Sequence, residues 1–439
     1  MTVGIARWAL PALVAAGLGW PVATAGAAAP EVKVYEGRGD GPELGAYTAP
    51  GGKRLRLRVA VGSALFRAPG DPPGEFWALS DRGPTVACDD AEDVLDVEGE
   101  DLCEDPELGR LFLDLGYTPS IYKVALDAAA GTFAVTGAVP LRSPDGRPAT
   151  GLPSPAAGGV AEVPLDGEGR RLEPDPGGVD SEGLVRLPDG TFWVGEENAP
   201  SLLHVAADGR ILRRLVPAGL EAELAGAGYP VEGTLPAVLA MRQPNRGIEG
   251  LALGEGGRFL YAAMQGPLAN PGEETFRKSA SLRLLKVDAA TGRPAAEFVY
   301  TLEPMSSFAG EERKAQSAAR VSELVHLGAE RFLVVDRTDR TAHLVAIDLA
   351  GATDILGSRW DDPATSPTLE ETALRAAGVR PAAKTVVFDT ADHPELPGKI
   401  EGAAVDADGS LVLVNDDDFG LGKDEETVLV RVKGLALGQ

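Results

Sequence analysis

The feature that most constrains this chain is a β-hairpin pattern that recurs along it. Four copies begin with similar residues: "DSEGLVRLPDGTFWVGEEN" (180–198), "GIEGLALGEGGRFLYAAMQGP" (247–267), "RVSELVHLGAERFLVVDRTD" (320–339) and "KIEGAAVDADGSLVLVNDDDFG" (399–420). A looser fifth copy, "GSALFRAPGDPPGEFWALSDRGP", covers 62–84. Each copy is an apolar run, a glycine-containing turn, a second run rich in β-branched or aromatic residues, and a polar end. Such repetition indicates a repeat architecture built from strands.

Further strand-like runs follow the hairpins. Pairs of such runs cover 120–141, 201–217, 281–302 and 342–356, while the last hairpin is followed by one run at 427–437. The missing strand is available at the other end of the chain, in "EVKVYEG" (31–37). The pattern predicts an all-β fold: a β-propeller of five or six four-stranded blades, closed by pairing of the N- and C-terminal strands. A sixth blade would have to lie in 131–180.

Helical patterns are weak. Only 308–320 and 368–378 have a helical distribution of apolar residues, and both lie between predicted strands. A parallel α/β sheet needs a crossover connection, usually a helix, between successive strands, so we exclude that fold class.

The propeller prediction brings acidic residues together. The first strand of each hairpin starts, and the second ends, at the same mouth of the central channel, and Glu182, Glu249, Glu323 and Glu401 lie at matching points of four hairpins. Crowded carboxylates repel one another unless they are protonated or hold a cation, and Ca²⁺ accepts irregular sets of oxygen ligands. The predicted ligands are Glu182, Glu197, Glu249, Glu323, Glu401, Asp416, Asp417 and Asp418. The alternative is that each glutamate caps a turn or pairs with an arginine of its own blade.

The overall charge excludes two classes of partner. The formal net charge is −25, and the 439 residues contain no block rich in Lys or Arg, so nucleic acid and anionic membranes would be repelled. The acidity also fits a simple role in solubility.

The N-terminus has the anatomy of a secretory signal peptide at residues 1–27: Arg7, an apolar stretch from Trp8 to Val22, and small residues before the cleavage site. No later segment reaches the roughly 18 apolar residues of a membrane span. We therefore expect a single domain over 31–439 that is exported to the periplasm or the extracellular space and is monomeric. In an oxidising compartment Cys88 and Cys103 are expected to form a disulfide, because neither CxxC spacing nor a nearby histidine supports a zinc site.

Motifs of several common enzyme classes are absent from the sequence. It contains no GxSxG, HExxH, GxxxxGK[ST] or strand-linked GxGxxG pattern, so serine hydrolase, zincin, P-loop and Rossmann interpretations lack support.

The repeated motifs, preceded by "FWALSDRGP" and ending with "NDDDFG", resemble the esterase-like phytase family over roughly residues 45 to 432. The resemblance implies an exported β-propeller related in architecture to calcium-dependent phytases, in which metal ions hold phosphate and activate water. The positions that match the family's polar residues are Asp81, Arg82, Glu182, Glu197, Glu249, Gln265, Arg337, Glu401, Asp416 and Asp418. Two positions depart from the family: Asp417 replaces a usual asparagine, and Ala64 replaces a usual glycine.

Three functions remain open at this point. The first is a metal-dependent phosphoester hydrolase in which calcium activates water, with Asp81, Arg82, Arg337 and Lys399 as catalytic residues. In this hypothesis Arg82, Arg337 or Lys399 contacts the phosphate. The second is a calcium-dependent carboxylester or lactone hydrolase with a carboxylate as general base, which suits the acidic mouth better for a neutral substrate. The third is a non-catalytic propeller that binds a ligand or protein.

Overall fold

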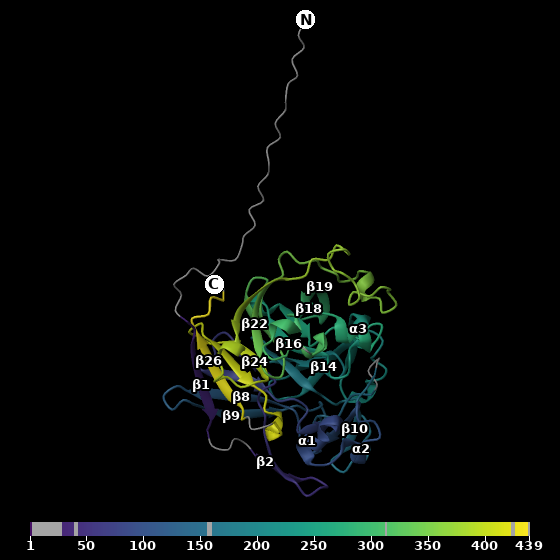
Figure 1. The fold of residues 1–439 in the computed structure, drawn as a ribbon, viewed down its shortest axis with the longest axis vertical. Coiled ribbons are helices and arrows are strands. Elements are labelled where there is room, and N and C mark those ends of the chain that lie inside the picture. Colours follow the sequence, from purple (N-terminus) through teal and green to yellow (C-terminus); the bar gives the residue numbers. More distant parts are fainter. Residues whose placement is uncertain (2–28, 39–42, 156–159, 312–313, 423–425, 438–439) are drawn as a thin grey trace.

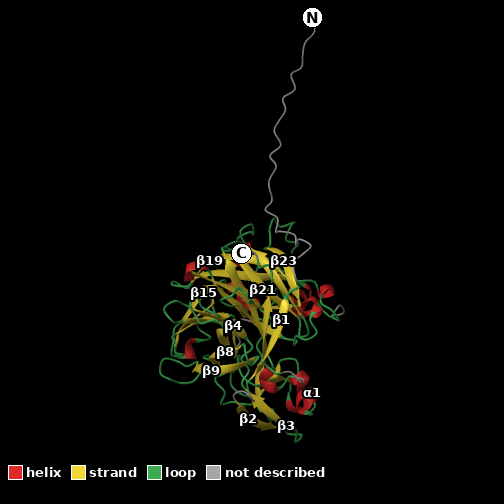
Figure 2. Ribbon diagram, turned by 90° about the vertical axis from the view of Figure 1, so that its left-hand side faces the viewer, coloured by secondary structure: helices red, strands yellow, loops and turns green. Residues whose placement is uncertain are grey.

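The computed structural model describes residues 1, 29–38, 43–155, 160–311, 314–422 and 426–437. Strands dominate this part of the chain, and the helices are short (Figure 2). The α-helices described are α1 (Ala91–Leu95), α2 (Gly99–Leu102) and α3 (Glu273–Lys278). The all-β prediction is confirmed. The two predicted helices are wrong, because the described residues of 308–320 and 368–378 form turns and one 3₁₀ turn.

Each of the five hairpins starts an antiparallel run of four strands. The first run is β4 (Ala64–Phe66), β5 (Glu75–Leu79), β8 (Ser120–Asp127) and β9 (Thr132–Pro140); the second is β11 (Ser181–Arg186), β12 (Phe192–Glu196), β13 (Ser201–Val205) and β14 (Ile211–Pro217). The third is β16 (Ile248–Leu253), β17 (Phe259–Met264), β18 (Ser281–Asp288) and β19 (Arg293–Thr301). The fourth is β20 (Arg320–Gly328), β21 (Arg331–Arg337), β22 (Ala342–Asp348) and β23 (Ala383–Asp389); the fifth is β24 (Ile400–Val405), β25 (Leu411–Asn415), β26 (Val428–Lys433) and β1 (Glu31–Gly37).

The two ends of the described domain pair as predicted. β1 is antiparallel to β26, with Val34 opposite Val430, and it also forms a short parallel pairing with β9. Figure 1 shows the purple β1 beside the yellow β26. This pairing joins the fifth run of strands to the first in one eight-stranded sheet.

The first strands of the five runs pack against one another in a ring. β4 contacts β11, β11 contacts β16, β16 contacts β20, β20 contacts β24, and β24 contacts β4. Close packing requires glycine at several points: a Cβ on Gly250 would lie 2.9 Å from backbone atoms of β20, and a Cβ on Gly402 would lie 2.7 Å from the backbone of Ala64. The arrangement is propeller-like, with the hairpin repeats facing a common axis.

A β-bulge occurs at the same point of four first strands. The register skips one residue between Ser181 and Gly183, and likewise at the equivalent points of β16, β20 and β24. The skipped residues are Glu182, Glu249, Ser322 and Glu401. The matching of Glu323 to these three glutamates is therefore wrong by one residue. Glu323 is equivalent to Gly183, Gly250 and Gly402 instead.

Two other expectations need correction. The described residues of 131–180 supply β9 and β10 (Val163–Asp166) and no additional four-stranded run. In the fourth run, the predicted pair over 342–356 is the single strand β22, and its partner β23 comes after a long insertion that packs around Trp360.

Outside the ring, residues 85–112 form an insertion that we call the disulfide segment. It contains α1, α2, β6 (Thr85–Ala87) and β7 (Gly109–Phe112), and β10 extends its small sheet. The Cys88–Cys103 disulfide is present, as predicted. A further hairpin, β2 (Glu43–Thr48) and β3 (Arg54–Arg58), lies beside it (Figure 1), and β15 (Val231–Leu235) adds a parallel fifth strand to β14.

Apolar side chains fill the spaces between neighbouring sheets. The largest core cluster joins Trp193 of the second run, Leu251 and Tyr261 of the third, and Phe332 of the fourth. The predicted signal peptide lies almost wholly in residues 2–28, outside the described residues. Among the helices that are described, none has the length and apolar composition needed to span a membrane.

Candidate functional site

The bulges direct charged side chains to one end of the ring. Ser181 is opposite Glu196, Ile248 opposite Met264, Val321 opposite Asp336, and Ile400 opposite Asn415. The residues that follow the second strands are therefore equivalent, and they meet the bulged glutamates at this end of the ring. We call this end the mouth; its residues are Asp81, Asp180, Glu182, Glu197, Glu249, Gln265, Arg337, Lys399, Glu401, Asp416 and Asp418.

Five carboxylates of the mouth come from the first three runs of strands. These residues, the acidic half, are Asp81, Asp180, Glu182, Glu197 and Glu249. One oxygen each of Glu182, Glu197 and Glu249 lies within 4.8 Å of the others, and the same holds for Asp81, Asp180 and Glu182. Glu182 is common to both sets. Three of the eight predicted metal ligands are thus brought together, and two further acids join them.

Burial and repulsion raise the pKa values of this half. Burial, with the neighbouring Glu249, raises the pKa of Glu182 well above its usual range, and burial next to Glu197 does the same for Glu249. The pKa of Glu197 rises to about 7, because burial and the nearby Asp180 outweigh the attraction of Arg246 and Arg82. These carboxylates are costly to ionise together unless a cation joins them.

Unpartnered oxygens show that the acidic half fits a hard cation. Among the described residues, Glu197 Oε1 and Glu249 Oε2 are buried without a hydrogen-bond partner, and so is Gln265 Oε1 beside them. Glu197 and Glu249 are each 2% exposed, so bulk water does not compensate them. Carboxylate and amide oxygens are the ligands that Ca²⁺ prefers, so the residues present fit this ion.

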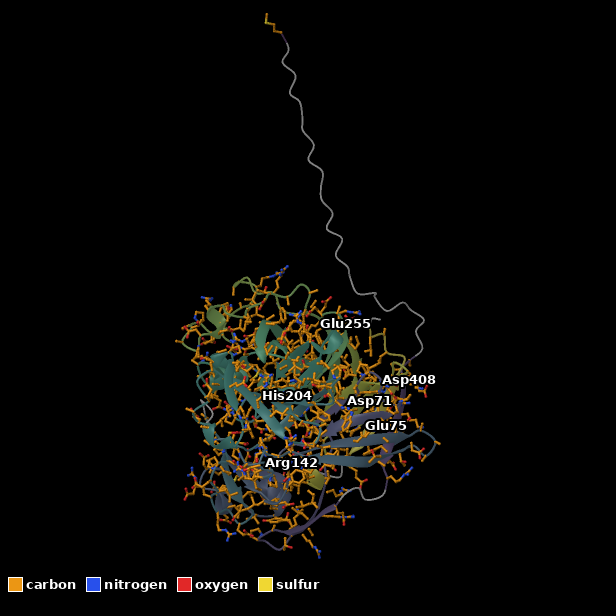
Figure 3. The ribbon with its side chains drawn as sticks, turned by 180° about the vertical axis from the view of Figure 1, so that it is seen from behind. Asp71, Glu75, Arg142, His204, Glu255 and Asp408 are labelled. Carbon is orange, nitrogen blue, oxygen red and sulfur yellow. A yellow bond between two sulfur atoms is a disulfide. The ribbon has the colours of Figure 1, made fainter. Side chains whose placement is uncertain are left out.

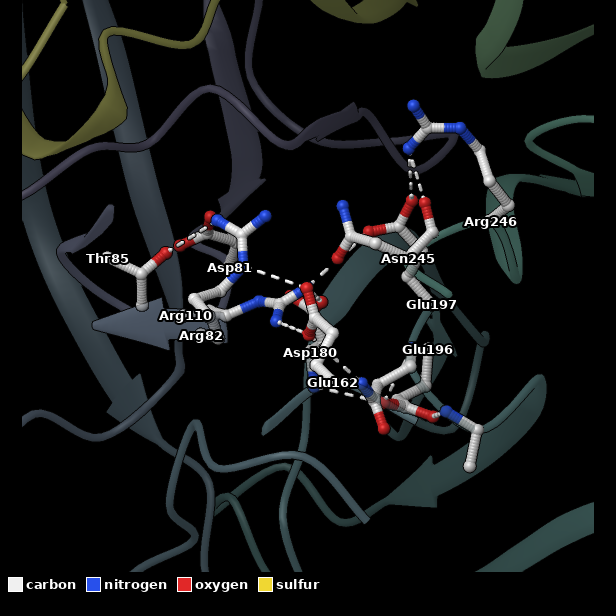
Figure 4. A network of polar contacts seen from close by, with 12 residues as sticks. Asp81, Arg82, Thr85, Arg110, Glu162, Asp180, Glu196, Glu197, Asn245 and Arg246 are labelled. Atoms are coloured by element: carbon white, nitrogen blue, oxygen red, sulfur yellow. Dashed lines mark hydrogen bonds and ion pairs between the residues drawn. The ribbon is translucent and has the colours of Figure 1, made fainter. Parts of the chain in front are cut away.

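Arginines hold the outer part of the acidic half in place (Figure 4). The Arg82 guanidinium donates to Glu162 and pairs with Asp180, and it lies 3.8 Å from Glu197. Arg110 of β7 donates to the other oxygen of Glu162 at 2.8 Å, which links the disulfide segment to the mouth. Burial acts to raise the pKa of Glu162, but the two arginines outweigh burial and lower this pKa to about 2. Arg82 was predicted to contact phosphate, but its two terminal nitrogens already face carboxylates.

The rest of the mouth, which we call the paired half, consists of Arg337, Lys399, Glu401, Asp416 and Asp418. The Lys399 ammonium lies 2.8 Å from Asp416, and it also pairs with Asp418, while Arg337 pairs with Glu401. For Asp418, burial acts to raise the pKa, but the attraction of Lys399 outweighs burial and the pKa is lowered. For Asp416, burial outweighs the attraction of Lys399 and the pKa is raised to about 7. Three of the predicted metal ligands therefore already have cationic partners.

The two remaining predicted ligands lie elsewhere. Burial raises the pKa of Asp417, while the charge of Arg58 and hydrogen bonds from Thr427 act to lower it. Arg58 and Thr427 are not residues of the mouth, so the Asp417 side chain interacts outside it. Glu323 is 1% exposed and accepts the backbone N–H groups of Leu65 at 3.2 Å and Leu324 at 2.9 Å. The N–H groups of Leu251 and Ala403 also donate to it. Glu323 thus joins four first strands through their backbones.

Cationic side chains gather next to the acidic half. Arg246 is 4.0 Å from Glu197. Burial is the main reason why the pKa of Arg320 falls to about 9, and the positive charges of Arg337 and Arg246 lower it further. Among the described residues, the Nε atoms of Arg246, Arg320 and Arg337 are buried without a hydrogen-bond partner. Buried N–H donors without a partner can donate hydrogen bonds to an anionic group that lies between the two halves of the mouth.

Sequence reasoning missed several of these residues. Asp180 stands at the start of a repeated hairpin, so its position could have been read from the repeat. Arg246 and Arg320 also immediately precede or begin first strands. Glu162 and Arg110 lie in an insertion outside the repeats, and no motif identifies them.

These observations define a class of protein: an all-β, propeller-like chain with a charged, cation-compatible channel mouth. A family model described as phytase-like, with esterase-like activity of phytase, matches residues 62–419. The chain belongs to this phytase-like family, as the resemblance of its motifs predicted.

One related sequence is a protein of Arthroderma benhamiae described as an uncharacterized secreted protein. It is 28% identical over 318 residues, which cover 65% of this chain and 59% of the relative. The chain therefore matches less than two thirds of that relative's length. A secreted relative and the disulfide both agree with the export predicted for this chain.

Solved structures give weaker likenesses. A calcium-binding protein, regucalcin, from Agrobacterium tumefaciens strain C58 is 14% identical, with 90% of this chain and 96% of that chain covered and a TM-score of 0.34. The Mala s 1 allergen of Malassezia sympodialis is 11% identical, with 87% and 84% covered and the same TM-score.

Proposed function

We propose that this protein is an exported, five-bladed β-propeller of one domain that hydrolyses ester bonds with the help of a bound cation, most favourably phosphoesters. The ring of five first strands and the β1–β26 pairing support the blade number. Membership of the phytase-like family supports ester hydrolysis. The observation that carries the proposal is that one mouth brings together a buried acidic cluster and several arginines, and that carboxylate oxygens of the cluster and the Nε atoms of the arginines lack a hydrogen-bond partner among the described residues.

Glu182, Glu197 and Glu249 would hold the cation, with Gln265 as a neutral oxygen ligand. Calcium is the proposed ion because these ligands are all oxygens and their arrangement is irregular. When bound, the cation would polarise an oxygen of the substrate and make a bound water more acidic.

The cationic residues favour a phosphoester over a neutral ester. Arg246 and Arg320 lie next to the acidic half, and Arg337 and Lys399 belong to the paired half. The Nε–H groups of the three arginines lack a hydrogen-bond partner among the described residues and would bind the phosphoryl oxygens. Because Glu401 and Asp339 already neutralise part of Arg337, we expect one phosphoryl group to be recognised rather than a polyanion.

Asp81 is the proposed general base. It is the least buried acid of the acidic half, and its Oδ1 accepts the N–H of Gly83 at 2.9 Å, which fixes its orientation. Its pKa is raised by burial and by Asp416 and Asp180, so it binds a proton more readily than an ordinary aspartate. The attacking water would give a proton to Asp81 as its oxygen bonds to phosphorus. The bond to the leaving alcohol would then break, and that oxygen would take a proton from solvent.

Hydrolysis of p-nitrophenyl phosphate, bis-p-nitrophenyl phosphate and p-nitrophenyl acetate, each with calcium and with EDTA, tests this function. We expect calcium-dependent release of p-nitrophenol from a phosphate substrate, with Asp81→Asn and Arg337→Gln reducing it by at least about 100-fold. Glu31→Gln, at the exposed first residue of β1, is the matched control and should retain full activity. Calcium-dependent activity on the acetate alone would support a carboxylester hydrolase, and no activity on any substrate would contradict the proposal.

A further inference from the structure

A second cavity lies at the opposite end of the ring from the mouth. Its volume is about 950 Å³, and all five first strands line it, from their middle residues to the hairpin turns. Leu65, Leu251, Leu324 and Ala403 form part of the lining, and these are the four residues whose N–H groups the Glu323 carboxylate accepts. The cavity is therefore built on the same backbone network that holds the ring together.

The walls of this cavity are mostly apolar. Phe66, Leu253, Val325 and Val405 continue the lining outward from the leucines, and each is partly exposed in the structure. Apolar side chains open to solvent in a concave surface of this size are typical of a small-molecule site.

The charged residues of the lining have the opposite sign to the protein as a whole. Three arginines, Arg67, Arg186 and Arg331, stand against one acid, Glu255, a difference of +2 in a chain of net charge −25. Glu255 is labelled on the side of the molecule seen from behind (Figure 3). Arg67 lies 3.4 Å from Asp406, and Arg186 lies 3.8 Å from Asp71, so both are partly compensated. Arg331 forms no ion pair with any residue that the structure describes.

We infer that this cavity binds a small molecule with an apolar body and one anionic group, with the body against the leucines and the anion beside Arg331. A partly exposed cation without an ion pair, next to an apolar pocket, favours an amphiphilic anion such as a medium-chain carboxylate. This site is separate from the mouth and does not depend on the proposed hydrolase activity.

Dodecanoate is the probe, measured by calorimetry and by displacement of the fluorescent sulfonate 8-anilinonaphthalene-1-sulfonate from the folded, full-length protein. We expect one dodecanoate per chain. Arg331→Gln should weaken binding by at least about tenfold. Val405→Trp, which enlarges a partly exposed side chain of the lining, should abolish it. Arg293→Gln, an exposed arginine on the outer strand β19, should bind as the wild type does.

Several results would overturn the inference. These are absence of dodecanoate binding, equal affinity in Arg331→Gln, or equal affinity for dodecyltrimethylammonium, which has the same chain and the opposite charge. The Arg331 variant changes a partly exposed side chain, so the inference stays testable even if Val405→Trp fails to fold.

Discussion

The two halves of the mouth are built from equivalent strand ends and yet have opposite electrostatics. Asp180 and Lys399 both lie just before the bulge of a first strand. Glu197 and Arg337 are equivalent at the end of a second strand, since each comes directly after the residue that pairs with the start of its first strand. In the acidic half these positions are carboxylates; Asp180 pairs with Arg82, and one oxygen of Glu197 has no hydrogen-bond partner among the described residues. In the paired half they are cations that neutralise Glu401, Asp416 and Asp418. Counting carboxylates therefore does not locate a cation site. Whether a carboxylate is free to bind a cation depends on whether an equivalent position supplies a Lys or Arg that already pairs with it.

The largest expected effect comes from removing the cation of the paired half. Lys399→Met should lower the free energy of unfolding by about 3 to 4 kcal/mol, because Asp416 and Asp418 lose their partner. This is the lower part of the range for a buried pair, since the Lys399 side chain is 23% exposed. The variant should also gain calcium-dependent stability. Urea unfolding measures both effects, with Lys433→Met, a cation on the exposed end of β26, as the control. A loss under 1 kcal/mol would show that the two halves do not differ as described.

The disulfide segment tests whether the mouth depends on its surroundings. Cys88→Ala with Cys103→Ala opens a loop with a sequence separation of 15 residues, and the expected loss is about 3 kcal/mol. The stabilisation by calcium should stay unchanged, because the disulfide segment contributes Arg110 and no carboxylate to the acidic half. If unfolding in urea shows no loss, or if the calcium effect disappears with the disulfide, this separation of roles is wrong.

The pH dependence of the calcium-free protein has a defined sign. Burial raises the pKa of Glu197 to about 7, so the folded protein binds more protons than the unfolded chain between roughly pH 4.5 and 7. The stability from this group is complete below pH 4.5 and is lost as the pH rises through 7. The expected loss is about 1 to 3 kcal/mol. Thermal unfolding from pH 4.5 to 8 should show this slope, and Glu197→Gln should reduce it; an unchanged slope in the variant would contradict the assignment.

Smaller effects should have opposite signs in the two halves. Without calcium, Glu249→Gln should raise the free energy of unfolding by about 1 kcal/mol, because it removes a buried carboxyl group that is costly to ionise beside Glu197. Glu401→Gln should lower it by a similar or larger amount, because Arg337 loses its partner. Melting temperatures in EDTA measure both, and shifts of the same sign would remove the distinction between the halves.

Much of this fold was predictable because each hairpin carries its own apolar alternation and turn residues. The terminal closure followed from counting strands, and the disulfide followed from the predicted export. The alignment of Glu323 failed because "VSEL" and "IEGL" place their glutamates one residue apart, and only the bulge register shows which is equivalent. A one-residue shift turns the side chain away from the mouth. Glu323 instead accepts backbone N–H groups of the first strands.

The site was predictable only in part. The repeats brought Glu182 and Glu249 together with Glu197 at the end of a second strand. They could not show that Lys399 neutralises Asp416, because pairing across neighbouring loops depends on the distances in the folded chain. Glu162 and Arg110 come from segments outside the repeats, and their meeting with Arg82 is a purely tertiary contact.

Calcium binding to the chelator-treated protein, measured by isothermal titration calorimetry, tests the central claim most directly. The wild type should bind calcium, and a hundredfold excess over its Kd should stabilise the fold by about 2.7 kcal/mol. Glu249→Gln should bind at least about tenfold more weakly, while Glu401→Gln should stay within about threefold of the wild type. No heat of binding in the wild type, or equal affinities in the wild type and Glu249→Gln, would contradict a cation site in the acidic half of the mouth.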